Sequence, residues 1–247
     1  MVLFDLDDTL FDHEQSARRA LTRVHQVHAA FAAWPFEAFE RAHAAVLEEL
    51  HAQVMTGGRS VDDAREERFS RLFAASGVAA DEALIRETAA AYREAYVFER
   101  RAIDGALDVL VALKPRVRIG IVSNNLLEEQ QAKIRLCRFD PYIDALIVSE
   151  AVGVAKPDPA IFRHALDALS CDAADAVMVG DSWAADIEGA RAAGIRPIWF
   201  NRGKRPAPVG TEVQEVAALV PIEPLMRAIF GSEPSPDSQS DLRCASA

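Results

Sequence analysis

The sequence predicts an α/β protein: a Rossmann-like, doubly wound parallel sheet that carries an inserted all-helical domain. An apolar run at 2–5 ends in a carboxylate, which is typical of a buried parallel strand running into a polar loop. From residue 103 onward, short apolar runs alternate with helical patterns, and this alternation favours a parallel sheet with helices on both faces. Residues 13–100 instead show helical periodicity with almost no β-branched runs, so they predict helices without a sheet.

The expected elements follow from these patterns. After the first strand, strands are expected at 117–123, 145–149, 176–181 and 196–200, with 216–220 as a weaker candidate. Helices are expected at 126–137, 158–169, 186–193 and 223–230, and about four more lie within 13–100, broken at Gly57-Gly58 and Gly77. The predicted domains are an α/β core at 1–12 and 101–231, a helical insertion at 13–100, and a disordered tail at 232–247.

Composition narrows the class of function. The chain has 247 residues and a formal net charge of −11, which disfavours nucleic acid and membrane surfaces as partners. The 3 cysteines are widely spaced and form no CxxC pair, so we expect reduced thiols in a cytoplasmic protein. No apolar stretch reaches the roughly 18 residues that span a bilayer, and the acid at residue 5 argues against a signal peptide. Oligomeric state cannot be inferred, and the short first strand leaves the true start of the chain open.

Polar side chains follow several predicted strands at the point where each strand ends. They are Asp5, Asp7 and Thr9, then Ser123 and Asn124, then Lys156, then Asp181 and Asp186. Ligands of open α/β sheets bind at the carboxyl ends of the strands, so we expect these side chains to converge. Converging carboxylates repel one another and favour a bound cation, and hard oxygen ligands select Mg²⁺.

This set of residue types suits phosphoryl transfer. A carboxylate beside a metal that binds a phosphoryl group can attack phosphorus. Lys156 and Ser123 could hold the equatorial oxygens of that group with positive charge and hydrogen-bond donors.

The motifs resemble those of the haloacid dehalogenase superfamily, in its phosphatase branch. Asp-Leu-Asp-Asp-Thr-Leu at 5–10 resembles the first motif of that family. Ser123, Lys156-Pro157 and Gly-Asp-Ser-x-x-x-Asp at 180–186 resemble the second, third and fourth, and the resemblance covers residues 1 to about 230. The helical block lies between the first and second motifs, where one branch of the family carries an all-helical cap.

The resemblance implies a role for each matching residue. Asp5 would be the nucleophile and a metal ligand, and Asp7 would be the general acid and then the base, with its backbone carbonyl facing the metal. Thr9 would support the loop and count among the substrate-binding residues. Ser123 and Asn124 would bind the phosphoryl group, and Lys156 would screen Asp5. Asp181 would be the second carboxylate on Mg²⁺, with Asp186 as a more distant metal partner. The implied activity is hydrolysis of a small phosphorylated metabolite through an aspartyl phosphate, with the ester itself left open.

Three other functions remain open to different degrees. A 2-haloacid dehalogenase also uses an attacking aspartate, but a halide needs no proton, so Asp7 argues against it. A phosphosugar mutase shares all the motifs, so the sequence distinguishes it poorly from a phosphatase. A regulatory receiver domain is about half this length and does not carry its accepting aspartate on the first strand.

Other residues have competing interpretations. Asp8 and Asp12 are expected to face solvent or cap a loop, and His25 and His28 to lie on a solvated helix face rather than bind metal. The aromatics Trp34, Phe36 and Phe39 are expected in the core of the insertion, with pocket lining as the minor alternative. Arg59 follows a glycine break, where it could bind a second anionic group of the substrate.

Overall fold

The computed structural model describes residues 1–55 and 57–231, so the predicted tail at 232–247 lies outside the described residues. Its sheet consists of β1 (Val2–Phe4), β2 (Ile119–Ser123), β3 (Ala145–Val148), β4 (Val177–Gly180), β5 (Arg196–Phe200) and β6 (Gln214–Val216). All neighbours are parallel, and the order is β3-β2-β1-β4-β5-β6. The predicted fold class is therefore confirmed, and the chain's first strand occupies the interior of the sheet.

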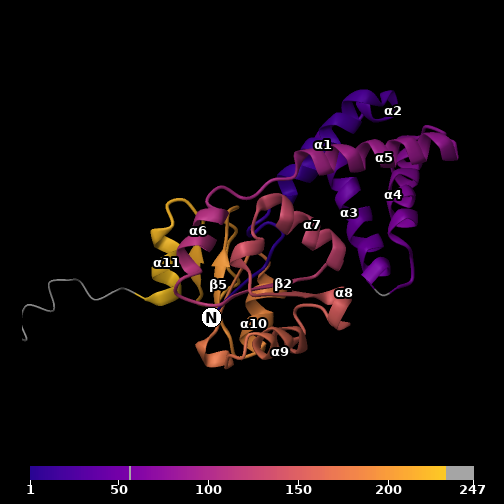
Figure 1. Ribbon diagram of the computed structural model, residues 1–247. Coiled ribbons are helices and arrows are strands. Elements are labelled where there is room, and N and C mark those ends of the chain that lie inside the picture. The colour runs from indigo at the N-terminus through magenta and orange to yellow at the C-terminus, as the bar shows by residue number, and fades with distance from the viewer. Residues whose placement is uncertain (56, 232–247) are drawn as a thin grey trace, which may run out of the picture.

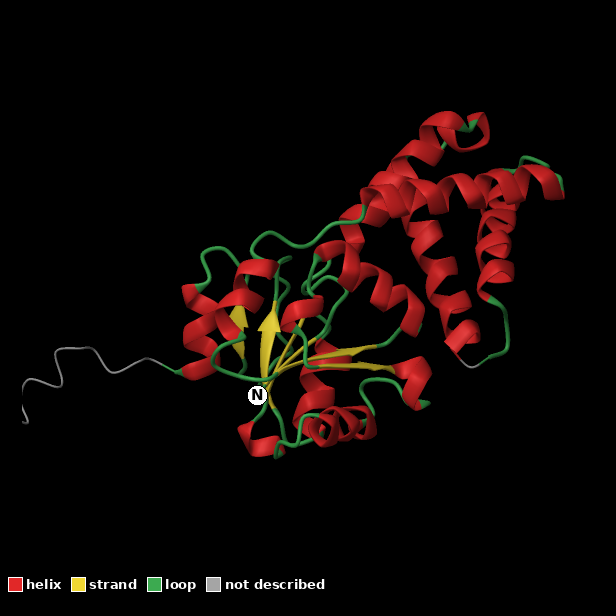
Figure 2. Ribbon diagram, viewed as in Figure 1, coloured by secondary structure: helices red, strands yellow, loops and turns green. Residues whose placement is uncertain are grey.

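The alternation of side chains along β1 assigns the two faces of the sheet. Val2 and Phe4 join one apolar cluster, with α6 (Ala106–Leu113), α7 (Leu127–Cys137) and α11 (Glu223–Phe230). Leu3 joins the opposite cluster, with α9 (Pro159–Ala168) and α10 (Gly189–Ala192). Helices thus cover both faces, as Figures 1 and 2 show. Burial on both faces explains why the strands read as continuous apolar runs.

Short helices complete this region of the chain: η1 (Asp140–Tyr142), α8 (Ser149–Val152), η2 (Ala173–Asp175) and the π-helical turn η3 (Trp183–Glu188). The sequence did not predict α6, whose residues are apolar almost throughout and resemble a buried strand as much as a helix. The expected helix at 186–193 is divided into η3 and α10, and β6 ends at Val216, where the predicted strand began.

The helical block after β1 consists of α1 (His13–Val27), α2 (Ala29–Ala32), α3 (Phe36–Met55), α4 (Val61–Ser76) and α5 (Glu82–Glu99). It projects to one side of the sheet, with α1 and α5 packed side by side (Figure 1). Two of its helices begin at side-chain caps: Ser60 Oγ accepts from Asp63 N at 3.1 Å, and Asp81 Oδ1 accepts from Leu84 N at 2.8 Å. Gly77, at a φ of 75°, ends α4.

The core of this block is aromatic. The ring of Phe31 lies 4.7 Å from the rings of both Phe39 and Phe73, centroid to centroid. His25 and His28 are half-buried, and the ring of His25 lies 5.5 Å from the ring of Phe36, so the predicted histidine face is only partly solvated. That imidazole fills space beside aromatic rings, which its i, i+3 spacing from His28 did not reveal.

The chain leaves and re-enters the α/β region at adjacent points. Asp12 N donates to Arg101 O at 3.0 Å, and the Asp12 carboxylate accepts from Arg101 and Arg202, each at 3.0 Å. Asp12 is only 4% exposed, so the expectation of a solvent-facing side chain is wrong: it joins the two connections. We propose that these connections mark the boundaries of the inserted domain. None of the helices within the described ranges is long and apolar enough to cross a membrane.

Candidate active site

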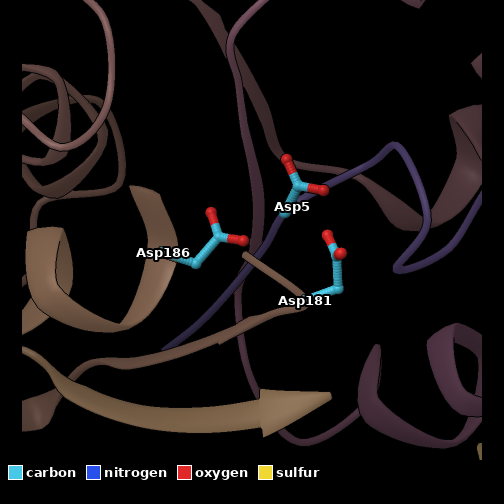
Figure 3. Close-up of side chains that lie close together, drawn as sticks. All are labelled: Asp5, Asp181 and Asp186. Atoms are coloured by element: carbon cyan, nitrogen blue, oxygen red, sulfur yellow. The ribbon is translucent and has the colours of Figure 1, made fainter. Parts of the chain in front are cut away.

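Three carboxylates converge beyond the carboxyl ends of β1 and β4. Asp5 follows β1, Asp181 follows β4, and Asp186 lies in the η3 turn. One oxygen from each lies within 4.8 Å of the others, and Figure 3 shows the three side chains lying close together. The structure therefore brings these three residues together at the sheet edge, as expected.

The local backbone explains how Asp186 reaches this position. A Cβ atom at Gly180 would lie 2.3 Å from Cγ of Asp186, so only glycine allows this approach. Asp186 Oδ2 accepts from Ser182 N at 2.9 Å, which fastens the carboxylate to the start of the η3 turn. Single π-helical turns are frequent at functional sites because they re-aim side chains, and here the turn directs Asp186 inward.

Lys156 lies between two of these carboxylates. Its Nζ donates to Asp5 Oδ1 and to Asp186 Oδ1, each at 2.6 Å, and the side chain is buried. Burial alone would lower the pKa of Lys156, but Asp186 and Asp5 raise it above its usual range, so the ammonium stays charged. Asn124 holds the lysine's backbone at both ends, since Oδ1 accepts from Lys156 N at 2.7 Å and Nδ2 donates to Lys156 O at 2.8 Å.

The carboxylates still exceed the positive charge available to them. Burial raises the pKa of Asp5 well above its usual range despite Lys156, with further contributions from Asp186 and Asp181. Burial and Asp186 raise the pKa of Asp181 to about 6, although Arg205 opposes the shift. A divalent cation among these hard oxygen donors would relieve that repulsion, so the residues present fit Mg²⁺.

Asp7 lies in a separate hydrogen-bonded cluster with α7. Its two carboxylate oxygens accept from Lys133 Nζ at 2.6 and 2.8 Å, and Oδ2 also accepts from Gln130 at 3.0 Å and Asn125 at 3.1 Å. Burial would raise the pKa of Asp7, but Lys133 and its other partners hold it well below its usual range. Asp7 is therefore an ionised carboxylate in this arrangement, and its side chain stands apart from the three converging carboxylates.

Sequence reasoning missed Lys133 and Gln130. Both are buried, and Gln130 Nε2 also donates to Ser123 Oγ at 2.6 Å, which orients that hydroxyl. The signal was available in part, because residues three apart share one face of a helix and this helix follows directly on the strand that ends in Ser123. From the sequence alone, long polar side chains such as these are expected on the solvated face of a helix, because the strand order is not known.

The first loop is organised from within. Asp8 Oδ1 accepts from Glu14 N at 2.8 Å near the start of α1, which confirms its expected capping role. Thr9 is completely buried, and its hydroxyl has no hydrogen-bond partner among the described residues. Thr9 thus fills the interior of the loop, and its role in binding substrate stays a prediction.

A cavity of about 390 Å³ extends from Asp7 into the helical block. Asn124, Asn125, Leu126, Glu129 and Lys133 line it from the α/β side. On the other side, α3, α4 and α5 contribute most of the wall, including His51, Arg65, Arg68, Tyr92, Arg93 and Tyr96. The cavity therefore joins the first loop to side chains far away in sequence.

The structure does not bring Arg59 into this cavity. Its Nε donates to Gln53 Oε1 at 3.1 Å, and it is absent from the described residues that line the wall. The predicted role of Arg59 in binding substrate thus lacks a structural basis. The aromatics Trp34, Phe36 and Phe39 also lie outside the wall and pack in the aromatic core of the insertion, as expected.

Comparison with curated proteins places this architecture among known hydrolases. A phosphoserine phosphatase from Thermus thermophilus is 31% identical over 231 residues, which cover 83% of this chain and 90% of that protein. A glyceraldehyde 3-phosphate phosphatase from Pyrococcus abyssi is 39% identical over 105 residues, but these cover only 42% of this chain and 44% of that protein.

Solved structures give the same placement. The HAD-hydrolase YfnB from Bacillus subtilis, bound to magnesium, aligns over 93% of this chain and 97% of its own, with 26% identity and a TM-score of 0.72. A 2-haloacid dehalogenase from Pseudomonas syringae aligns over 92% of this chain and 97% of its own, with 25% identity and a TM-score of 0.60. The family profile of haloacid dehalogenase-like hydrolases matches residues 1–194, and this chain belongs to that family.

Proposed function

We propose that this protein hydrolyses small phosphate monoesters, with Mg²⁺ bound by Asp5 and Asp181 and with Asp5 as the residue that is phosphorylated. The observation that carries the proposal is the convergence of Asp5, Asp181 and Asp186 with Lys156 at one edge of the sheet. The similarity to named phosphatases supports the same reaction class.

In the first step, a carboxylate oxygen of Asp5 attacks phosphorus and the bond from phosphorus to the leaving oxygen breaks. Lys156 Nζ, already 2.6 Å from Asp5 Oδ1, compensates negative charge next to the attacking oxygen. Ser123 Oγ, which accepts from Gln130 Nε2 at 2.6 Å, would donate its proton to an equatorial oxygen. When bound, Mg²⁺ would neutralise charge on the carboxylates and on the phosphoryl group.

Asp7 is the proposed proton carrier. It would give a proton to the departing alkoxide, and would take one from the water that then attacks the phosphorylated Asp5 and releases inorganic phosphate. Because Lys133 keeps Asp7 ionised in the present arrangement, the first transfer requires Asp7 to part from Lys133 and take up a proton from water before it meets the leaving group. The second transfer, in which Asp7 accepts a proton, uses the ionised form directly.

The presence of Asp7 also separates the proposed reaction from dehalogenation. A halide leaves as an anion without a proton, whereas an alkoxide needs one, and this chain maintains a half-buried carboxylate with four hydrogen bonds two residues after Asp5.

A phosphate-release screen over a panel of phosphate monoesters, with Mg²⁺ present, tests the proposal. We expect hydrolysis of several members and none by an Asp5→Asn variant that melts at a similar temperature. A folded protein that releases phosphate from no member, or releases chloride from 2-chloropropionate instead, contradicts it.

A further inference from the structure

Arg68 is a buried cation in the wall of the cavity. It lies on α4, faces the cavity with Tyr92 and Arg65, and is only 8% exposed. A buried guanidinium is costly unless hydrogen bonds and an opposite charge compensate for the water it has lost. Its contacts therefore show whether the protein alone satisfies it.

The other strongly basic groups of this wall each have a carboxylate partner. Arg65 pairs with Asp62 at 2.8 Å, Arg93 with Glu129 at 2.7 Å, and Lys133 with Asp7 at 2.6 Å. Within residues 1–55 and 57–231, no carboxylate pairs with Arg68. The lack of a carboxylate partner is therefore specific to Arg68 and is not shared by the other strongly basic side chains of this wall.

Arg68 also retains unused hydrogen-bond donors. Nη1 contacts His43 Nε2 at 3.3 Å, and the Nε atom is buried without a partner in the described chain. Burial and Arg68 itself lower the pKa of His43 well below its usual range, so the imidazole is neutral and brings no compensating charge. The Tyr92 ring, with its centroid 5.8 Å from the guanidinium carbon, offers only a weak attraction.

Extending the proposed function, on which this step rests, we infer that Arg68 binds a second anionic group, a carboxylate or a phosphate, on the leaving-group part of the substrate. The planar guanidinium fork matches either group in a bidentate contact. The cavity connects Arg68 with Asp7, so one small molecule can have its ester oxygen near Asp7 and a second charge near α4. Leu47 and Val54 supply apolar wall for the carbon skeleton between the two ends.

Matched substrate pairs test this inference. 3-Phosphoglycerate and glycerol 3-phosphate differ only in a carboxylate against a hydroxymethyl group; fructose 1,6-bisphosphate and fructose 6-phosphate differ in a second phosphate. We expect the wild-type kcat/KM to favour the anionic member of at least one pair by about 10- to 100-fold. The pair that shows the preference identifies whether the second group is a carboxylate or a phosphate.

Two arginine variants locate the preference. Arg68→Gln should lower kcat/KM for the anionic member by that same factor and leave the neutral member within about 3-fold. Arg65→Gln is the matched control, because Arg65 lines the same cavity on the same helix but is already paired with Asp62. Arg68→Lys keeps the charge without the fork, so it should lose most of the preference and serves if Arg68→Gln does not fold.

The outcomes separate this inference from the proposed function. Hydrolysis of the neutral esters with no preference in either pair, or equal losses on both members in Arg68→Gln, overturns the role of Arg68 alone. If no ester is hydrolysed, the proposed function fails, and calorimetric binding of the same pairs then decides. Equal affinities of each pair's two members for the wild-type protein overturn the inference in that case as well.

Discussion

Charged side chains are compensated differently at the sheet edge and in the wall of the helical insertion. At the edge, Lys156 bridges Asp5 and Asp186, and Lys133 neutralises Asp7. In the wall, Arg68 is buried with a neutral histidine and an aromatic ring as its neighbours. At the edge, lysine–carboxylate pairs hold the reactive arrangement in place and leave an excess of negative charge for a metal ion, whereas the unpaired positive charge in the wall provides attraction for an anionic molecule that arrives from outside.

The largest effect is expected from the edge, at the nucleophile. Asp5→Asn removes the attacking oxygen's charge but keeps the size of the side chain, so turnover should fall by about 10⁴-fold or more. Phosphate release and a thermal melt by circular dichroism measure the two properties separately. A folded variant with activity within about tenfold of wild type would falsify the assignment of Asp5 and leave the edge without a nucleophile.

Metal removal should have an effect almost as large. Asp5, Asp181 and Asp186 lie within 4.8 Å of one another and repel, so an added cation is needed to hold both them and a phosphoryl group. We expect EDTA to abolish phosphate release and excess Mg²⁺ to restore it. Calorimetry should show that Asp181→Ala weakens Mg²⁺ binding; undiminished activity in EDTA contradicts the metal assignment.

The next effect is specific to the leaving group. Asp7→Ala should reduce turnover of an alkyl phosphate by about 10²–10⁴-fold, because the departing alkoxide no longer receives a proton. p-Nitrophenolate leaves without much assistance, so p-nitrophenyl phosphate should lose much less. Equal losses on the two substrates mean that Asp7 serves only to hold Lys133 and the loop.

The same contrast explains what the sequence could predict. Asp5, Ser123 and Asp181 come directly at the ends of strands, and parallel strands bring their carboxyl ends to one edge, so local pattern and topology rules placed them. The identities of the wall residues depend on how α3, α4 and α5 pack together. Arg68 reads as an ordinary surface arginine on a helix of low apolar content, and only the tertiary structure shows that it is buried.

The position of Arg59 outside the cavity wall has the same origin. A glycine break suggested a close approach to ligand, but the orientation of α3 and α4 directs the neighbouring Arg65 and Arg68 to the cavity instead. Likewise, the pairing of Asp7 with Lys133 joins residues 126 positions apart, which no local pattern predicts.

Breaking the pair of Asp7 and Lys133 should destabilise the folded protein through the loss of charge compensation rather than through a loss of packing. Lys133→Met keeps the aliphatic length but leaves the half-buried Asp7 without its cation, which should lower the free energy of unfolding by about 2–4 kcal/mol. Urea unfolding followed by circular dichroism measures the loss. The double variant Lys133→Met with Asp7→Asn is the control and should recover much of it; no recovery means that the cost of the single change is steric.

The smallest expected effect concerns the link between the two regions themselves. Glu129 on α7 accepts from Arg93 on α5 at 2.7 and 2.9 Å and also pairs with Arg100, so it joins the helical insertion to the sheet region. Burial would raise the pKa of Glu129, but Arg93 and Arg100 lower it to about 2 from an ordinary value of 4.5. Because the folded pKa is the lower one, the stabilisation is complete above about pH 4.5 and is lost as pH falls toward 2.

Glu129→Gln should therefore cost about 1–2 kcal/mol at pH 7 and progressively less below pH 4.5. Urea unfolding of both proteins across this range measures the difference, with Glu128→Gln, an exposed neighbour on the same helix, as the matched control. A cost that stays constant from pH 7 to pH 3 would show that Glu129 stabilises the connection by shape and hydrogen bonding rather than by its charge.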